Sequence, residues 1–464
     1  MLQRQFLLGS VLAGLCVLDI ASSQSVFASQ EETTPADYTV SISPDDPRRA
    51  HVSATLMPKE GKMCFDRAAD DTGLTHGWAT FVHKLKIEDP NGQAVGAQYD
   101  GNHCWALDSS GPVSVSYTVL LQHDRFPNMP GDDELAYAGD WGQFWTGRAL
   151  FAEGAPTNNV TVTFSLPKNW AVTAPWGSNK KSTMVFSPSG FDALFDSGFM
   201  VGTHSSRTFQ HGNAIVRIGL AGEGPEARSD ELVTIASDAL SAFSTLHESG
   251  PEGYLAIFLG RGRTLGGGVM GQTISMVVVD DVPDQLMPTL SYIVIHEAFH
   301  LWNANFNYAD VPQMYWFSEG FAEYFTHLQL RENSMIDAST LRERFEQRAE
   351  RYEAVAGVQS MASAGTDKLN NYDLIYSGGM MAALALDMQI RKTSNGDYRL
   401  GDVLPVLAAD FGPGSDEGLS NAKLAEVIER RTGVEVGSIV DRYVNGLGRL
   451  PTSELIDDFL ETYE

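Results

Sequence analysis

The chain has 464 residues, of which 43% are hydrophobic and 20% are charged. This composition is typical of a folded globular protein and excludes a disordered or coiled-coil chain. The formal net charge of −27 would repel phosphate backbones, so we expect no nucleic-acid partner.

The beginning of the chain has the pattern of an export signal. Arg4 lies in a short basic region, an apolar run extends from Phe6 to Leu18, and Val26-Phe-Ala28 fits a cleavage site. An N-terminal membrane anchor is the alternative, but the apolar run is shorter than a membrane-spanning helix requires. We expect residues 1–28 to be a signal peptide, no stable membrane insertion after cleavage, and an exported protein that is periplasmic or extracellular.

Removal of such a signal would leave two cysteines, Cys64 and Cys104. An even pair in an exported chain favours a disulfide over two buried thiols. Two cysteines are too few for a disulfide scaffold or for a zinc module held by cysteines.

Residues 29–225 are expected to form an antiparallel β-sandwich. Three segments alternate apolar and polar residues, and turn signals lie between such segments. The alternating segments are 38–42, 113–119 and 160–166.

Residues 226–464 are expected to form a second domain that contains strands and then mostly helices, so the fold class is α+β. Helical spacing covers 230–243, and two short apolar runs at 254–259 and 273–279 indicate buried strands. Thr340 and Glu343 have the spacing of a capping box at the start of a charged helix. Further helices are expected at about 372–392, 419–431 and 453–463.

The motif H-E-x-x-H, formed by His296, Glu297 and His300, indicates a zinc site. On a helix, residues four apart lie on one face, so both imidazoles can reach one Zn²⁺. Glu297 would lie beside the metal, where a carboxylate can take a proton from the attacking water and pass it to the leaving amine.

A catalytic zinc site uses three protein ligands and one open position. Glu319 is the candidate third ligand, because eighteen residues separate it from His300 and leave room for a turn and a second helix. Glu323, four residues later, is more often a surface residue, and orienting a metal ligand is the alternative.

The segments His296–Asn303 and Trp316–Phe321 resemble the H-E-x-F-H-x-W-N and W-F-x-E-G-F motifs of the glycyl aminopeptidases, the sixty-first metallopeptidase family. Tyr376-Ser-Gly-Gly379 is similar to that family's Y-x-K-G motif. The resemblance implies a gluzincin zinc peptidase with a β-sandwich and a thermolysin-like catalytic domain. It also implies that Tyr376 donates a hydrogen bond to the oxyanion, with Tyr372 as a rival.

The chain departs from this family at three points. Gly378 replaces the lysine of Y-x-K-G, and Met270 stands where the family has a glutamate that binds the substrate's free amino terminus. Many members also end in a PDZ domain, for which we expect no room here.

The sequence therefore predicts an exported peptidase with one Zn²⁺ per chain on His296, His300 and Glu319. Because Met270 cannot pair with an ammonium group, we expect that a free substrate amino terminus is not required. The alternatives are a glycyl-type aminopeptidase with another amine anchor and a peptide-binding protein of this fold that has lost catalysis. The strand at 273–279 is expected to form the sheet edge that pairs with substrate.

Overall fold

The computed structural model describes residues 35–43, 45–46, 48–67, 74–121, 136–178, 184–244, 253–261, 266–278 and 283–463. The expected signal peptide, residues 1–28, lies outside these ranges. Within them, no helix combines the length and the apolar character needed to cross a membrane.

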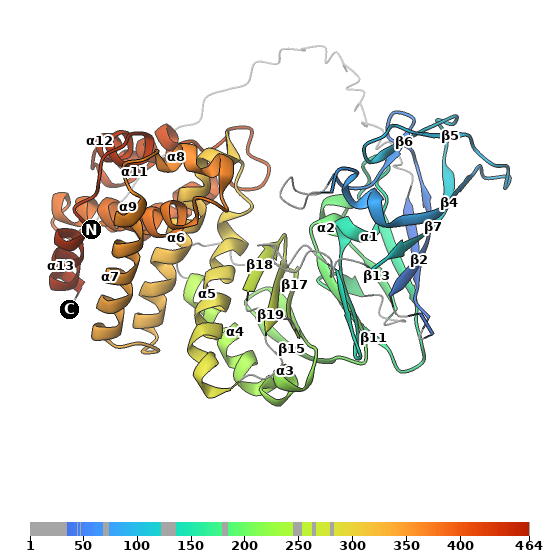
Figure 1. Ribbon diagram of the computed structural model, residues 1–464, viewed down its shortest axis with the longest axis horizontal. Helices are drawn as coiled ribbons and strands as arrows, with labels where there is room; N and C mark the ends of the chain where they lie inside the picture. Colours follow the sequence, from blue (N-terminus) through green and yellow to red (C-terminus); the bar gives the residue numbers. More distant parts are fainter. Residues whose placement is uncertain are drawn as a thin grey trace, which may run out of the picture. The chain divides into compact units, whose positions relative to one another are not determined.

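The N-terminal part is built from three sheets (Figure 1). The seven-stranded sheet has the order β12 (Gly177–Ser178), β13 (Val185–Ser187), β10 (Val160–Ser165), β1 (Ala36–Ser41), β2 (Arg49–Leu56), β7 (Val113–Leu120), β4 (Val82–Glu88). The four-stranded sheet has the order β11 (Ala171–Thr173), β14 (Gly198–Gly202), β9 (Gly142–Thr146), β8 (Tyr137–Gly139). The three-stranded sheet has the order β3 (Lys62–Cys64), β6 (Cys104–Leu107), β5 (Ala97–Tyr99).

The two larger sheets share one hydrophobic core, as the alternating segments predicted. In β2, every second residue is buried, which directs Val52 and Leu56 inward. Phe164 of β10 contacts Phe199 of β14, with ring centroids 5.6 Å apart. One pairing differs from the expected antiparallel arrangement, since β1 and β10 run parallel. A long connection separates these two strands in the chain, which permits parallel pairing.

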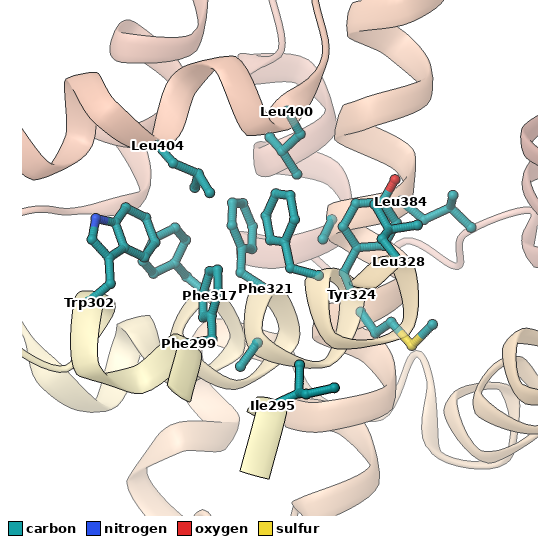
Figure 2. Packing of buried hydrophobic residues seen from close by; sticks show 14 of the residues in the cluster. Ile295, Phe299, Trp302, Phe317, Phe321, Tyr324, Leu328, Leu384, Leu400 and Leu404 are labelled. Carbon is teal, nitrogen blue, oxygen red and sulfur yellow. The ribbon is translucent and has the colours of Figure 1, made fainter. Parts of the chain in front are cut away.

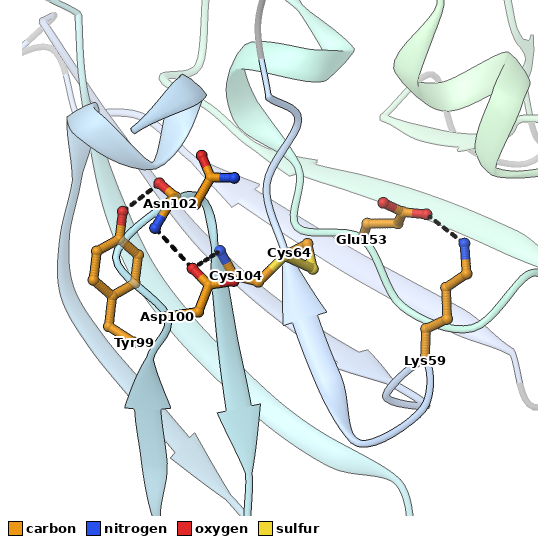
Figure 3. Close-up of a disulfide and its surroundings, with 7 residues drawn as sticks. All are labelled: Lys59, Cys64, Tyr99, Asp100, Asn102, Cys104 and Glu153. Atoms are coloured by element: carbon orange, nitrogen blue, oxygen red, sulfur yellow. Dashed lines mark hydrogen bonds and ion pairs between the residues drawn. A yellow bond between two sulfur atoms is a disulfide. The ribbon is translucent and has the colours of Figure 1, made fainter. Parts of the chain in front are cut away.

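The disulfide between Cys64 and Cys104 is confirmed (Figure 3). The two residues lie directly opposite each other on β3 and β6. The loop before Cys104 is held by Asp100, whose Oδ1 accepts hydrogen bonds from the backbone N–H groups of Asn102 and Cys104. The disulfide therefore cross-links β3 and β6, two neighbouring strands of the three-stranded sheet.

A five-stranded mixed sheet follows, with the order β15 (Ser205–His211), β16 (Ala214–Leu220), β17 (Gly253–Arg261), β19 (Thr273–Val278), β18 (Gly266–Met270). The expectation that 273–279 forms the edge was wrong, because the glycine-rich run folds back after β17 and pairs with β19 as β18. The edge strand that contacts α5 is therefore β18. The expected domain boundary at 225 and 226 remains a prediction, and the parallel pair β16–β17 joins strands on both sides of it.

Helices make up most of the remaining chain, which confirms the α+β class. The longer helices are α4 (Ser229–Ser244), α5 (Met287–Asn303), α6 (Val311–Glu332), α7 (Ala338–Val355), α9 (Tyr372–Thr393), α10 (Leu404–Phe411), α11 (Asn421–Thr432) and α13 (Thr452–Tyr463). The shorter ones are α3 (Glu223–Ala227), α8 (Met361–Ala364) and α12 (Gly437–Ile439), and two more, α1 (Gly147–Leu150) and α2 (Phe191–Phe195), lie within the N-terminal part. The helix α7 begins earlier than the expected capping box, because the Asp337 side chain accepts from the backbone N–H of Thr340.

The buried faces of α5, α6 and α9 form one core with the C-terminal helices (Figure 2). Phe299 of α5 stacks on Phe325 of α6, with centroids 5.4 Å apart. Leu400 and Leu404 close the same cluster from the segment after α9. This packing fixes the direction in which the polar residues of α5 and α6 point.

The helices α6 and α9 cross in close backbone contact at two glycines. A Cβ atom at Gly320 would lie 2.2 Å from the carbonyl carbon of Gly379, and one at Gly379 would lie 2.3 Å from the carbonyl oxygen of Trp316. Real Cβ atoms essentially never approach so closely. Glycine at both positions therefore brings Glu319 and Tyr376, which lie beside the crossing, toward each other.

Asp387 connects the same helices at their other end. Its Oδ2 accepts hydrogen bonds from Tyr324 and Arg391, both at 2.6 Å, and its Oδ1 accepts from the backbone N–H of Leu400. The segment Leu386–Arg391 thus has a structural role, since Asp387 ties α9 to α6 and to the following turn.

Candidate metal centre

The helix α5 carries His296, Glu297 and His300, next to the core that α5 shares with α6 and α9. Its apolar face, which includes Val294 and Phe299, is buried against the neighbouring helices. The two histidines lie one helical turn apart, as the H-E-x-x-H spacing predicted. Their side chains are buried, and so is that of Glu297.

The helix α6 brings Glu319 to the two histidines. The Oε2 atom of Glu319 lies 3.4 Å from His296 Nε2 and 3.2 Å from His300 Nε2, and the two Nε2 atoms are 3.2 Å apart. Ligand atoms about 2.0–2.1 Å from a tetrahedral zinc ion lie about 3.3–3.4 Å from one another. The three donor atoms therefore form a triangle of the size that zinc requires, and the residues fit the metal.

Asn303 fixes the orientation of the His300 imidazole. The Nδ1 atom of His300 donates to Asn303 Oδ1 at 2.9 Å, and Asn303 Nδ2 in turn donates to the carbonyl of Ser318. This chain of bonds fixes the amide orientation and places the imidazole proton on Nδ1. The lone pair of Nε2 is then free to point toward His296 Nε2 and Glu319 Oε2, which is the orientation that a metal ligand requires.

Glu297 lies beside the triangle and under the sheet edge. A methyl group at Gly267 of β18 would lie 3.1 Å from Glu297 Cγ, so the edge strand passes directly over this carboxylate. Burial raises the pKa of Glu297 above its usual range, and the nearby histidines partly oppose this effect. A raised pKa suits a group that accepts a proton and later returns it.

Of the two tyrosines at the start of α9, Tyr376 is the one that faces the histidines. Its ring lies parallel to that of His296, with centroids 6.2 Å apart, whereas Tyr372 stacks on its outer side at 4.0 Å. Burial, together with the charge of Glu319, raises the pKa of Tyr376 well above its ordinary value. The hydroxyl therefore remains a neutral hydrogen-bond donor.

The expectation that Glu323 is a surface residue was wrong. Its side chain is 2% exposed, and Oε2 forms an ion pair with Arg348 Nη2 at 2.7 Å while Oε1 accepts from Tyr292. Oε1 also lies 3.8 Å from His296 Nδ1. The structure thus places Glu323 behind the metal triad, on the side of His296.

Lys368 contacts the metal triad from outside. Its Nζ lies 2.7 Å from Glu319 Oε1, the oxygen that does not face the histidines. Burial would raise the pKa of Glu319, but Lys368 and His300 outweigh it and hold that pKa well below its usual range. Glu319 is therefore ionised, as a metal ligand must be.

Met270 at the end of β18 is buried and faces away from this site. It packs in an apolar cluster with Trp141, Phe144 and Met200. Side-chain positions alternate between the two faces of a strand, so Gly267 and Met270, three positions apart in β18, face opposite sides of the sheet. Gly267 faces Glu297, whereas Met270 faces the other side.

Three contributors to the site were missed by the sequence analysis. Asn303 could have been found, because it lies three residues after His300 on the same helix face. Arg348 and Lys368 carry no local signal, since they reach the site from α7 and from the turn before α9.

Known structures share this fold. The crystal structure of an aminopeptidase N family protein from Idiomarina loihiensis matches with a TM-score of 0.78 and 19% identity, covering 91% of this chain and 78% of that chain. A mutant M1 zinc metallopeptidase from Deinococcus radiodurans matches with a TM-score of 0.58 and 15% identity, covering 90% and 95%. The same enzyme bound to a Tyr-Ser-Ala substrate gives 0.56 and 14%, with the same coverage. At these identities the likeness establishes a common fold alone.

A search of curated proteins found no match to the sequence. Two family models do match, one in the β-rich N-terminal part and one in the helical part. The model of the peptidase M61 N-terminal domain covers residues 37–203, and that of the M61 glycyl aminopeptidase covers residues 289–377, which include the histidines, Glu319 and Tyr376. Together the two matches span more than half of the chain and show that the protein belongs to the M61 metallopeptidase family.

Proposed function

We propose that the protein is an exported zinc-dependent peptidase in which His296, His300 and Glu319 hold the metal. The observation that carries this proposal is the triangle of three donor atoms, 3.2–3.4 Å apart, beside the buried carboxylate of Glu297. A zinc ion bound there would supply a Lewis acid for a water molecule and for the peptide carbonyl.

The protein side chains would move the protons and stabilise charge. Glu297 takes a proton from the attacking water and delivers it to the leaving amine, since its raised pKa suits both steps. Tyr376 donates a hydrogen bond to the carbonyl oxygen as negative charge develops on it. The stack with His296 supports this placement of the hydroxyl near the scissile bond.

The edge of β18 is the proposed binding site for the substrate backbone. An extended peptide can add to a sheet edge through backbone hydrogen bonds. The absence of a side chain at Gly267 lets β18 pass close to Glu297, since a Cβ there would lie 3.1 Å from Glu297 Cγ. A peptide paired with this edge would lie beside β18, next to Glu297.

We further propose that a free substrate amino terminus is not essential. Met270 is packed among aromatic residues and offers no charge to an ammonium group. The test compares one peptide with a free and with an acetylated amino terminus. We expect similar kcat/KM values. A loss of a hundredfold or more on acetylation would instead show a glycyl-type aminopeptidase, the activity after which the matching family model is named, with an anchor elsewhere.

Export is proposed on two supports. The first is the signal-like sequence of residues 1–28, and the second is the disulfide between Cys64 and Cys104, which is stable in an oxidising compartment. Fractionation of cells that make the full chain, with sequencing of the mature amino terminus, tests this. Recovery of the intact chain in the cytoplasm would contradict it.

Glu297→Gln separates metal binding from catalysis. Glutamine keeps the shape of the side chain but cannot accept the proton, and loss of a general base typically costs about 10²–10⁴ in rate. We expect wild-type zinc content and a loss of this size in kcat/KM. Glu343→Gln on the exposed side of α7 is the matched control, with wild-type activity expected. A fully active Glu297→Gln variant would contradict the proposal, as would wild-type protein that binds peptides but never cleaves them.

A further inference from the structure

We propose that Lys368 is the fixed counter-ion of Glu319 and that it restricts this ligand to one oxygen on the metal. The inference rests on the proposed function, because it concerns the same metal site. It assigns a positioning role to a residue that lies 49 positions beyond the ligand in the sequence.

The two oxygens of Glu319 have different partners. Oε2 faces His296 Nε2 and His300 Nε2, whereas Oε1 accepts a hydrogen bond from Lys368 Nζ at 2.7 Å. A carboxylate can bind a metal through one or both oxygens. With Oε1 held by an ammonium group, only Oε2 is free to act as a ligand.

The ammonium group of Lys368 is fixed by its surroundings. Nζ lies 4.8 Å from the ring centroid of Tyr315 and 5.5 Å from that of Tyr376, within the range of cation–π attraction. The turn that carries Lys368 is pressed against the start of α6, since a Cβ at Gly365 would lie 1.8 Å from the carbonyl oxygen of Pro312. Both the base and the tip of the lysine are therefore held in place.

This contact has a definite effect on metal affinity. Without a metal, Lys368 neutralises the buried carboxylate of Glu319. A divalent cation at the histidines shares that carboxylate with Lys368 and is repelled by the ammonium charge. Removing the lysine destabilises the metal-free protein more than the metal-bound protein, so the metal should bind more tightly. Lys368 thus lowers the affinity for zinc. Because it also keeps Oε1 of Glu319 off the metal, one coordination position stays open.

The test compares Lys368→Met with Lys368→Arg, which keeps the charge, and with Lys423→Met as the control. Lys423 also pairs with a glutamate, Glu417, but lies on α11. Zinc dissociation constants are measured by competition with a chelator, and the number of oxygen ligands by X-ray absorption at the zinc edge. We expect Lys368→Met to bind zinc at least tenfold more tightly with one extra oxygen ligand. We expect the other two variants to stay within threefold of wild type.

Two results would overturn the inference alone. One is a Lys368→Met variant with the dissociation constant and the ligand number of wild type. The other is wild-type protein in which Glu319 already binds through both oxygens, a measurement that remains decisive if the variant does not fold. Wild-type protein that binds no zinc would instead overturn the proposed function, and the role of Lys368 with it.

Discussion

Gly379→Ala tests whether the helix crossing positions the catalytic residues. The added Cβ would lie 2.3 Å from the carbonyl oxygen of Trp316 and 2.9 Å from the Cα of Gly320. Both neighbours are backbone atoms of α6, so no side-chain rotation can relieve the contact. The helices α6 and α9 must separate instead.

The size of the separation follows from these distances. To bring the contact from 2.3 Å to an ordinary 3.4 Å, α9 must move by about 1.1 Å. Overpacking of this kind costs about 1–3 kcal/mol, and the upper value of about 3 kcal/mol applies here because backbone atoms cannot rotate away. Alanine in place of glycine in a helix returns about 1 kcal/mol, which leaves a net loss of about 2 kcal/mol. Tyr376 moves with α9 while Glu319 stays with α6, and a misplacement of about 1 Å can cost about a hundredfold in kcat/KM.

The adjacent glycine provides the control. A Cβ at Gly378 meets side-chain atoms of Tyr352, Met361 and Leu374 at 3.0–3.4 Å, and these can yield by a few tenths of an ångström. Urea unfolding and kcat/KM for one peptide are measured on both alanine variants. We expect Gly378→Ala to stay within about 0.5 kcal/mol and a few-fold of wild type. A Gly379→Ala protein with wild-type stability and activity would refute the positioning argument.

Three further predictions concern single side chains. Tyr376→Phe should lower kcat by about 10²–10³ with unchanged zinc content, and full activity would transfer the role to Tyr372. Glu323→Gln should weaken zinc binding by about 10–100-fold in chelator competition, because a carboxylate near His296 Nδ1 is lost, and an unchanged dissociation constant would contradict this. Burial lowers the pKa of His204 to about 4. Between pH 6.5 and 4 the unfolded chain therefore binds a proton that the folded chain excludes, so stability should fall by up to about 3 kcal/mol with acidification. Urea unfolding of wild type and His204→Gln at pH 7 and pH 4.5 measures this, and equal pH dependence of the two would contradict it.

The parts of the site that the sequence predicts are those set by local spacing. His296 and His300 are four apart on one helix, so their convergence follows from helix geometry alone. The distance from His300 to Glu319 predicts a second helix but not its crossing angle. The alternation in β1, β7 and β10 and the disulfide pair were likewise visible in the sequence.

The errors arose where distant segments meet. Glu323 lies four residues after Glu319 and so shares its helix face, but a glutamate is usually exposed, and only α7 explains its burial by supplying Arg348. The composition of 273–278 fits an edge strand. The glycine-rich run pairs with it on its outer side as β18, and composition alone does not predict this pairing. Lys368 carries no pattern at all, because its partner is fixed by the packing of a turn against α6.

The central claim is that the triangle of His296, His300 and Glu319 holds the zinc ion on which peptide hydrolysis depends. Elemental analysis of protein purified without added zinc, with peptide cleavage measured on the same fractions, tests it most directly. The account predicts close to one zinc per chain and activity that rises in proportion to zinc content. Metal-free protein that cleaves peptides at the same rate would contradict it.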